Sequence, residues 1–194
     1  MIFTALDERL DLFCVREALP LEIYKELSKI KLETVPYTKM EWQKQINRRK
    51  LMQLPGSIFK TIHSHINDNI KSISDLLGRS VSHIDTAFWY DTEGFDFDTH
   101  IDNPAVQDVM QIYLNDCAET GTTFYDVPES DVEEKDDEQF WHYQGAQPPQ
   151  KIRHKFEFKQ NTGYLMRNHK QQVHGVPGKV LESDHRLSVY CWIH

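Results

Sequence analysis

Apolar residues in the first part of the chain recur at the spacing of amphipathic helices. The longest such series advances in steps of three and four residues: Ile58, Ile62, Ile66, Ile70, Ile73 and Leu77. Residues at these steps lie on one face of a helix. The series therefore predicts one long helix over 58–77 with its apolar stripe packed in the core, and Gly78 is suited to end it.

A shorter helix is predicted upstream of this one. Because proline fits the first turn of a helix, Leu19-Pro20 marks its start. Its apolar face would consist of Ile23, Tyr24, Leu27 and Ile30. The apolar-rich residues 10–15 predict an early strand. The polar, basic stretch 42–54 is compatible with either a second helix or a loop.

The sequence of the second part of the chain is typical of short strands separated by turns. Strands are predicted at 81–90, 106–114, 122–125, 155–158, 163–167, 172–176 and 186–193. Helices followed by many short strands indicate an α+β fold. A double-sheet jelly roll is one arrangement that protects the edges of such strands. We therefore expect a single domain over 1–194, with helical support over 1–80 and a jelly-roll core over 81–194.

The last predicted strand is two-sided. One face would carry Arg186, Ser188, Tyr190 and Trp192, and the other Leu187, Val189, Cys191 and Ile193. The apolar face suits packing against helices. The polar and aromatic face suits the lining of a cavity.

Residues 127–150 form a polar insertion with an acidic centre. A loop of this length is usually functional or disordered. We interpret it as a flap whose Phe140, Trp141 and Tyr143 cover a pocket; a solvated surface excursion is equally compatible with the sequence.

Composition limits the possible partners. The chain has 194 residues, 22 basic against 30 acidic, and a net charge of −8, which disfavours a nucleic acid partner. The short basic run at 44–50 indicates a solvated face, or otherwise a surface that steers an anionic ligand. Three cysteines without a paired spacing favour a reducing compartment. No apolar run is long enough to span a bilayer, so we expect a cytoplasmic protein without a membrane partner.

Two histidines and one aspartate form the most specific chemical pattern. His100 and Asp102 are two residues apart, so a strand would direct both to one side. A neighbouring strand would add His174. Two imidazoles and a carboxylate hold Fe(II) on one face and leave the opposite positions open. Arg186, with Ser188 two residues later, could then bind a carboxylate of a dicarboxylic co-substrate.

At this point the chain resembles the Fe(II)/2-oxoglutarate-dependent dioxygenases, and within them the prolyl-hydroxylase-like group. The resemblance covers about residues 85–194. It is carried by Tyr90, His100-Ile101-Asp102-Asn103-Pro104, Ile112-Tyr113-Leu114-Asn115, Gly121-Thr122-Thr123-Phe124, Gly163, His174-Gly175-Val176 and Arg186-Leu187-Ser188. It implies a double-stranded β-helix, or jelly roll, buttressed by N-terminal helices.

The resemblance also implies roles for single residues. His100, Asp102 and His174, the metal triad, would bind iron and form the catalytic centre. Arg186 would pair with the distal carboxylate of 2-oxoglutarate, and Ser188 and Tyr113 would hydrogen-bond that carboxylate. Tyr90, ten residues before His100, would touch the co-substrate or the substrate near the iron.

The implied reaction consumes O2 and converts 2-oxoglutarate to succinate and CO2 while an aliphatic C–H is hydroxylated. The resemblance favours a prolyl or other polypeptide residue as substrate, with a free amino acid or small metabolite as the alternative. A non-catalytic jelly-roll module that binds metal is a competing hypothesis, and base demethylation on nucleic acid is a third. The single glycine before Thr122 and the acidic insertion depart from the family pattern and leave the substrate open.

Overall fold

The computed structural model describes residues 1–194 except 8–10, 40–47, 104 and 136–139. Its helices are α1 (Leu21–Leu27), α2 (Gly56–Asn67) and α3 (Ile70–Leu77), with short 3-10 turns η2 (Leu32–Thr34) and η3 (Glu129–Asp131). Among the described residues, no helix has both the length and the apolar character needed to cross a bilayer.

Two antiparallel sheets make up the strand-rich part. The eight-stranded sheet has, in spatial order, β1 (Ile2–Asp7), β2 (Leu12–Arg16), β12 (Thr162–Arg167), β7 (Asp108–Tyr113), β14 (Arg186–Ile193), β5 (Ile84–Asp91), β4 (Arg49–Met52) and β3 (Tyr37–Lys39). The four-stranded sheet has β11 (Ile152–Lys155), β8 (Thr123–Tyr125), β13 (His174–Val176) and β6 (Phe97–His100). A separate pair consists of β9 (Val132–Lys135) and β10 (Phe140–Tyr143).

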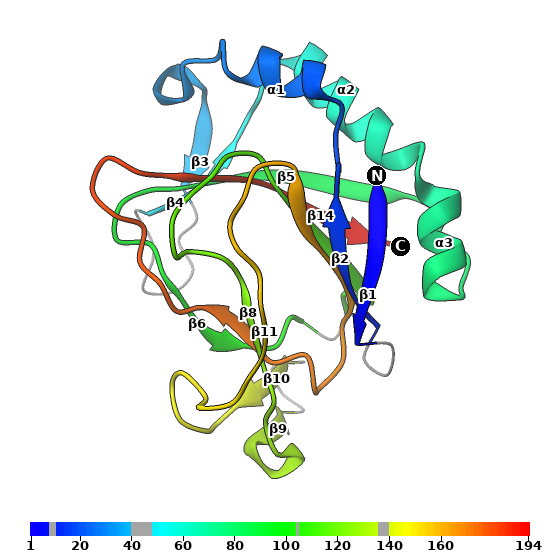
Figure 1. The fold of residues 1–194 in the computed structure, drawn as a ribbon, viewed down its shortest axis with the longest axis vertical. Coiled ribbons are helices and arrows are strands. Elements are labelled where there is room, and N and C mark those ends of the chain that lie inside the picture. Colours follow the sequence, from blue (N-terminus) through cyan, green and yellow to red (C-terminus); the bar gives the residue numbers. More distant parts are fainter. Residues whose placement is uncertain (8–10, 40–47, 104, 136–139) are drawn as a thin grey trace.

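The helices cover one side of the large sheet, and the small sheet lies on the other side (Figure 1). The core on the helix side includes Ile62, Ile66, Ile73, Leu77, Leu187, Val189, Cys191 and Ile193. The alternation predicted for the last strand is thereby confirmed, down to its bounds. The α+β jelly-roll prediction is confirmed as well, because two antiparallel sheets face each other under a layer of helices.

The single helix predicted over 58–77 is wrong, because the structure divides it at residues 68 and 69. Side-chain amides end α2: Asn67 Nδ2 donates to the carbonyl oxygen of His63 (2.9 Å), and Asn69 Nδ2 to that of His65 (2.8 Å). Such local side-chain bonds compete with helix propagation. Gly78 ends α3 in the left-handed conformation, as predicted (φ 64°).

The other differences concern single strands. Strands β1 and β3 were not predicted, and β4 occupies part of 42–54 where a helix or loop was expected; residues 42–47 lie outside the described residues. The strand predicted at 155–158 lies instead at Ile152–Lys155. Phe156 and Phe158 are both buried and two residues apart, which is the spacing of a strand. In the structure, however, Phe158 forms only an isolated bridge with Cys117.

The insertion 127–150 contains the β9–β10 pair, so it is partly regular structure. Tyr143 packs against the small cluster of Ile101, Tyr125 and Val173. Gln147 lies beside β6: its Oε1 accepts from the Thr99 amide (3.0 Å), and its Nε2 donates to the Thr99 carbonyl (3.2 Å). The insertion thus lies along the strand that ends at His100, and its role as a flap remains a prediction.

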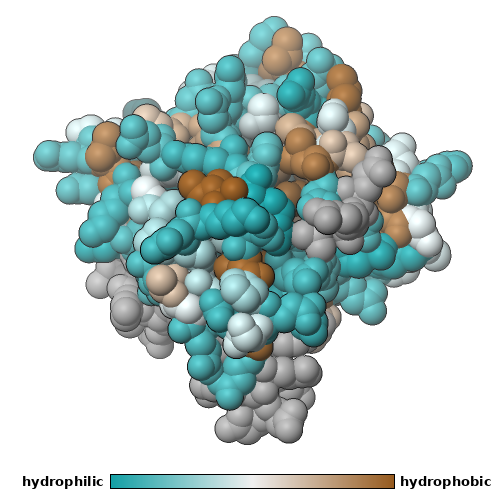
Figure 2. Space-filling view, turned by 60° about the horizontal axis from the view of Figure 1, so that its bottom comes forward, coloured by the Kyte–Doolittle hydropathy of each residue, from teal (hydrophilic) through white to brown (hydrophobic). Residues whose placement is uncertain are grey.

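Figure 2 shows one face of the molecule on which hydrophobic residues form separate small groups among hydrophilic ones. Such a distribution is ordinary for a protein surface in contact with water.

Gly163 in β12 allows the close pairing of β12 with β7. A Cβ atom at this position would lie 1.9 Å from the carbonyl oxygen of Gln111. We predict that Gly163→Ala lowers the free energy of unfolding by about 1–3 kcal/mol, the usual cost of overpacking. Urea denaturation measures this change. The matched control is Gly56→Ala, since a Cβ there meets nothing within 4 Å; equal stability of the two variants would contradict the prediction.

Candidate metal centre

Two histidines face each other across adjacent strands of the small sheet. His100 is the last residue of β6, His174 is the first of β13, and the two are register partners. Asp102 follows β6 rather than lying in it, which differs from the strand geometry expected from the sequence. Its carboxylate nevertheless reaches both rings: Oδ1 lies 3.5 Å from His100 Nε2, and Oδ2 lies 3.8 Å from His174 Nε2. One ligand atom from each of the three residues lies within 4.8 Å of the others.

Backbone carbonyls orient both imidazoles. The Nδ1 of His100 bonds the carbonyl oxygen of Asp98 (2.8 Å), and the Nδ1 of His174 bonds that of Gln172 (2.7 Å). A carbonyl only accepts, so each Nδ1 carries a proton, which leaves Nε2 as the ring atom that could bind a metal. Histidines that bind metals are typically held in this way.

The electrostatics favour the protonation states that a metal requires. Burial lowers the pKa of His174 to about 4, with a further lowering by His100. His174 is therefore neutral at ordinary pH. Burial opposes ionisation of Asp102, but the neighbouring His174 and His100 and the hydroxyl of Tyr190 outweigh it and hold the pKa of that carboxyl below its usual value. The Tyr190 hydroxyl donates to Asp102 Oδ2 at 2.8 Å.

Arg186, at the start of β14, is fully buried. Its Nη1 donates to Oδ2 of Asp91 (3.1 Å), an acid that is also 0% exposed. The guanidinium carbon of Arg186 lies over the rings of Phe158 and Phe95, 4.6 and 5.2 Å from their centroids. Among the described residues, its Nε and Nη2 have no hydrogen-bond partner. Two buried donors of one cation thus remain available to an acceptor.

A second arginine shares the same aspartate. Arg49 Nε donates to Asp91 Oδ1 (2.7 Å), and Nη2 donates to Oδ2 (3.0 Å). The sequence placed Arg49 in a basic run with a solvated face, but its side chain is only 15% exposed. Arg49 and Asp91 are therefore functional candidates that sequence reasoning missed, because their pairing joins residues 42 positions apart.

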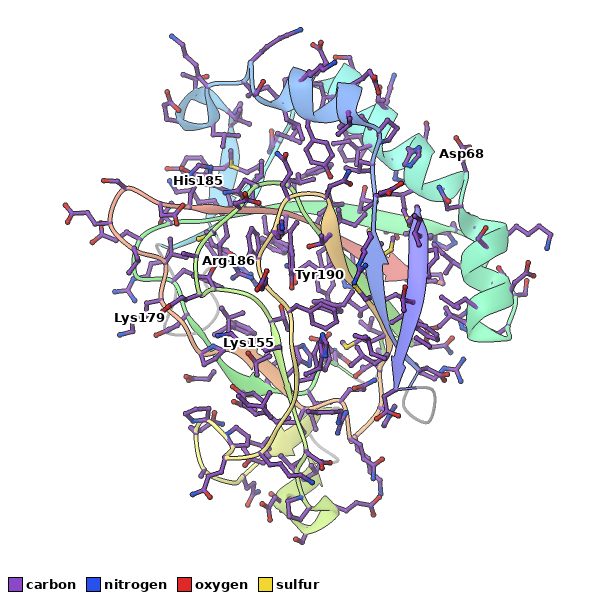
Figure 3. All side chains as sticks on the ribbon, in the orientation of Figure 1. Asp68, Lys155, Lys179, His185, Arg186 and Tyr190 are labelled. Carbon is purple, nitrogen blue, oxygen red and sulfur yellow. The ribbon has the colours of Figure 1, made fainter. Side chains whose placement is uncertain are left out.

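One cavity of about 540 Å³ connects the metal triad with the arginines. Its lining includes Arg49, Trp89, Phe97, His100, Ile101, Asp102, Val106, Gln111, Thr122, Tyr164, His174, Val176, Arg186, Tyr190 and Trp192. Figure 3 shows Arg186 and Tyr190 pointing into the interior of the molecule. A hollow of similar volume, about 560 Å³, lies at residues 116–119, 121 and 155–159, but its lining has no histidine and no buried charged residue.

Ser188 and Tyr113 lie buried on neighbouring strands as register partners. Ser188 Oγ accepts from Gln111 Nε2, and the Tyr113 hydroxyl donates to Thr122 Oγ1, each at 3.0 Å. Gln111 and Thr122 line the cavity and were not among the predicted site residues. Gln111 and Tyr113 are two residues apart on β7 and therefore share a face of the sheet.

Of the predicted site residues, Ser188, Tyr113 and Tyr90 are absent from the cavity lining. Tyr90 faces away from the cavity. It packs against the helix-side core, and its ring lies 5.4 Å from that of His185. Successive residues of a strand point to opposite faces. Trp89 lines the cavity and Asp91 contacts both cavity arginines, so Tyr90 between them faces away.

Comparison with known proteins establishes the fold. No protein-family model matches the sequence, and no curated protein matches it significantly. Solved structures do match. HygX from Streptomyces hygroscopicus, with nickel and 2-oxoglutarate bound, is 10% identical and has a TM-score of 0.64, covering 94% of this chain and 82% of its own. A Pseudomonas putida prolyl-4-hydroxylase is 13% identical with a TM-score of 0.59, covering 95% and 92%.

A third match is the α-ketoglutarate-dependent epimerase SnoN from nogalamycin biosynthesis, at 14% identity and a TM-score of 0.64, covering 94% of this chain and 78% of its own. The chain therefore has the double-stranded β-helix fold that these oxygenase structures share.

The Asp91 carboxylate is expected to be the main structural support of the cavity. We predict that Asp91→Asn lowers the free energy of unfolding by about 3–5 kcal/mol, because two buried or nearly buried guanidiniums lose their shared counter-charge. Asp75→Asn is the matched control, since Asp75 pairs with Lys71 on the exposed surface and its loss should cost at most about 1 kcal/mol. Denaturant unfolding compares the two variants; similar losses would contradict the proposed importance of this buried charge.

Proposed function

We propose that this protein is an Fe(II)- and 2-oxoglutarate-dependent dioxygenase that hydroxylates an aliphatic C–H. The observation that carries the proposal is the cavity itself. It combines a two-histidine, one-carboxylate triad with a fully buried arginine whose Nε and Nη2 have no partner among the described residues.

The residues present fit Fe(II). His100, Asp102 and His174 would hold it through two imidazole Nε2 atoms and a carboxylate oxygen, the set typical of non-heme iron oxygenases. When bound there, iron would supply the redox chemistry that couples decarboxylation of 2-oxoglutarate by O2 to oxygenation of a C–H. The Tyr190 hydroxyl holds the Asp102 carboxylate in place.

The residues also fit a dicarboxylate. Burying a guanidinium without full pairing is costly, and a carboxylate accepting from Arg186 Nε and Nη2 would relieve that cost. The resemblance adds hydrogen bonds from Ser188 and Tyr113, although neither lines the cavity and each bonds a residue that does, Gln111 or Thr122. Asp91 orients Arg186, while the rings of Phe95 and Phe158 exclude water from it. A non-catalytic metal-binding module gives no reason for this buried, incompletely paired cation.

For the substrate we propose a polypeptide residue, such as proline, with a small molecule as the second candidate. The fold likeness to a prolyl-4-hydroxylase supports the first. The second is favoured by the cavity volume of about 540 Å³, within the usual range of small-molecule sites. Labelling with ¹⁸O2 in a lysate separates them: one heavy atom enters succinate in either case, and the other enters a peptide in one case and a metabolite other than succinate in the other. The acidic net charge of −8 disfavours nucleic acid.

We predict that Arg186→Ala weakens 2-oxoglutarate binding about 30-fold or more, because truncating one partner of a buried charge pair costs at least about 2 kcal/mol. Anaerobic titration of the Fe(II)-loaded protein, followed by its visible charge-transfer absorbance, measures this affinity. Tyr90→Phe is the control and should bind 2-oxoglutarate normally, because Tyr90 packs on the helix side of β5. If Arg186→Ala binds 2-oxoglutarate with unchanged affinity, the assignment of Arg186 as the group that binds its carboxylate is wrong.

We predict that His174→Ala abolishes succinate formation from 2-oxoglutarate in air, because the iron loses one of its three ligands. His169→Gln, which removes an imidazole outside the triad, should retain it. Circular dichroism checks that both variants keep the fold. Sustained, iron-dependent succinate formation by His174→Ala would overturn the proposed function.

A further inference from the structure

The tripeptide His-Ile-Asp occurs twice in this chain. The first copy is residues 83–85, and the second is residues 100–102, which supply two of the metal ligands discussed above. In each copy, a histidine from an adjacent strand lies against the His and Asp. For the second copy this residue is His174; for the first it is His194, which directly follows β14.

The first copy places its groups at distances like those of the second. Asp85 Oδ2 lies 3.4 Å from His194 Nε2 and 3.8 Å from His83 Nε2. The rings of His83 and His194 are stacked, with centroids 4.6 Å apart and planes inclined by 11°. Ligand atoms of the three residues all lie within 4.8 Å of one another.

The backbone and one hydroxyl hold this arrangement. The Ser82 amide donates to the His194 carbonyl (2.7 Å), and the His194 amide donates to the His83 carbonyl (3.0 Å). The Ser82 hydroxyl donates to the same His194 carbonyl (3.2 Å) and contacts His83 Nδ1 (2.9 Å). Since that hydroxyl has a single proton, Nδ1 must donate to it. A neutral His83 would then present an unprotonated Nε2 toward Asp85, as a metal-binding histidine does.

We propose that His83, Asp85 and His194 form a second site for a borderline divalent cation of the zinc type, separate from the triad in the cavity. In a tetrahedral zinc site, bonds of about 2.0–2.1 Å place neighbouring ligand atoms about 3.3–3.4 Å apart. The observed separations of 3.4 and 3.8 Å are close to this value. The two imidazole planes are nearly parallel, so the rings would have to turn relative to each other to direct both Nε2 lone pairs at one ion.

The site lies at the other end of β14 from Arg186. The strand runs from Arg186 to Ile193, a span of about 23 Å at about 3.3 Å per residue. All three side chains are exposed, so water can complete the coordination. A cation here would join the end of β14 to the segment that begins β5, and it would stabilise this end of two central strands of the sheet without entering the cavity.

Zinc binding to variants of the full chain tests the proposal. Equilibrium dialysis against Zn²⁺, with metal analysis, should find two zinc ions per chain in the wild type and one in His174→Ala. The double variant His174→Ala/His83→Gln should bind none tightly, and His174→Ala/Asp85→Asn should agree with it. The matched control His174→Ala/His169→Gln should still bind one. Zn²⁺ should also raise the Tm of His174→Ala but not that of the variants altered at His83 or Asp85.

The proposal is overturned if the His83→Gln and Asp85→Asn double variants bind as much zinc as His174→Ala alone, or if the His169→Gln control loses zinc equally. His83 and Asp85 are exposed and His169 is half-buried, whereas His174 is buried, so circular dichroism verifies that each variant is folded. The His83→Gln single variant should retain 2-oxoglutarate-dependent succinate formation, which separates this site from the proposed catalytic one.

Discussion

The ion pair between Arg186 and Asp91 is the interaction on which the cavity depends. Both groups are fully buried, and burial of a charge is costly unless it is paired. Arg49 also bonds this aspartate, so two guanidiniums share one carboxylate and the three groups together carry a net charge of about +1. At the other end of the cavity, a divalent metal with Asp102 would also leave one positive charge. A dianion that spans the two ends, such as a dicarboxylate, balances both.

The two sheets contribute different halves of this arrangement. The small sheet supplies His100 and His174 as register partners of β6 and β13, so the spacing of the two imidazoles is set by strand pairing. The large sheet supplies Arg186 and Asp91, which are register partners of β14 and β5. The helices bury the opposite face of the large sheet. Because His100, His174, Arg186 and Asp91 all lie on paired strands, these parts of the cavity are in place before any ligand enters.

Sequence patterns predicted the parts of the molecule that depend on local periodicity. Strand β14 was predicted with correct bounds because its polar and apolar residues alternate strictly, and that parity placed Arg186 on the cavity side. The same rule excludes Tyr90 from the cavity: its distance of ten residues from His100 suggested a role, whereas its position between Trp89 and Asp91 determines its face. Arg49 could not be predicted, since its contact with Asp91 arises only when β4 pairs with β5.

The two His-Ile-Asp segments show what a short motif does and does not determine. In both, a histidine from an adjacent strand completes a set of ligand atoms, so strand pairing alone is enough to create a candidate metal site. Among the residues that the structure describes, only the copy at 100–102 adjoins a cavity with a buried arginine, and only there does a tyrosine hydroxyl bond the carboxylate. Reaction chemistry requires a space from which water is excluded and a second anchor for the co-substrate. The exposed copy has neither among the described residues, which suits a cation that stabilises structure rather than one that reacts.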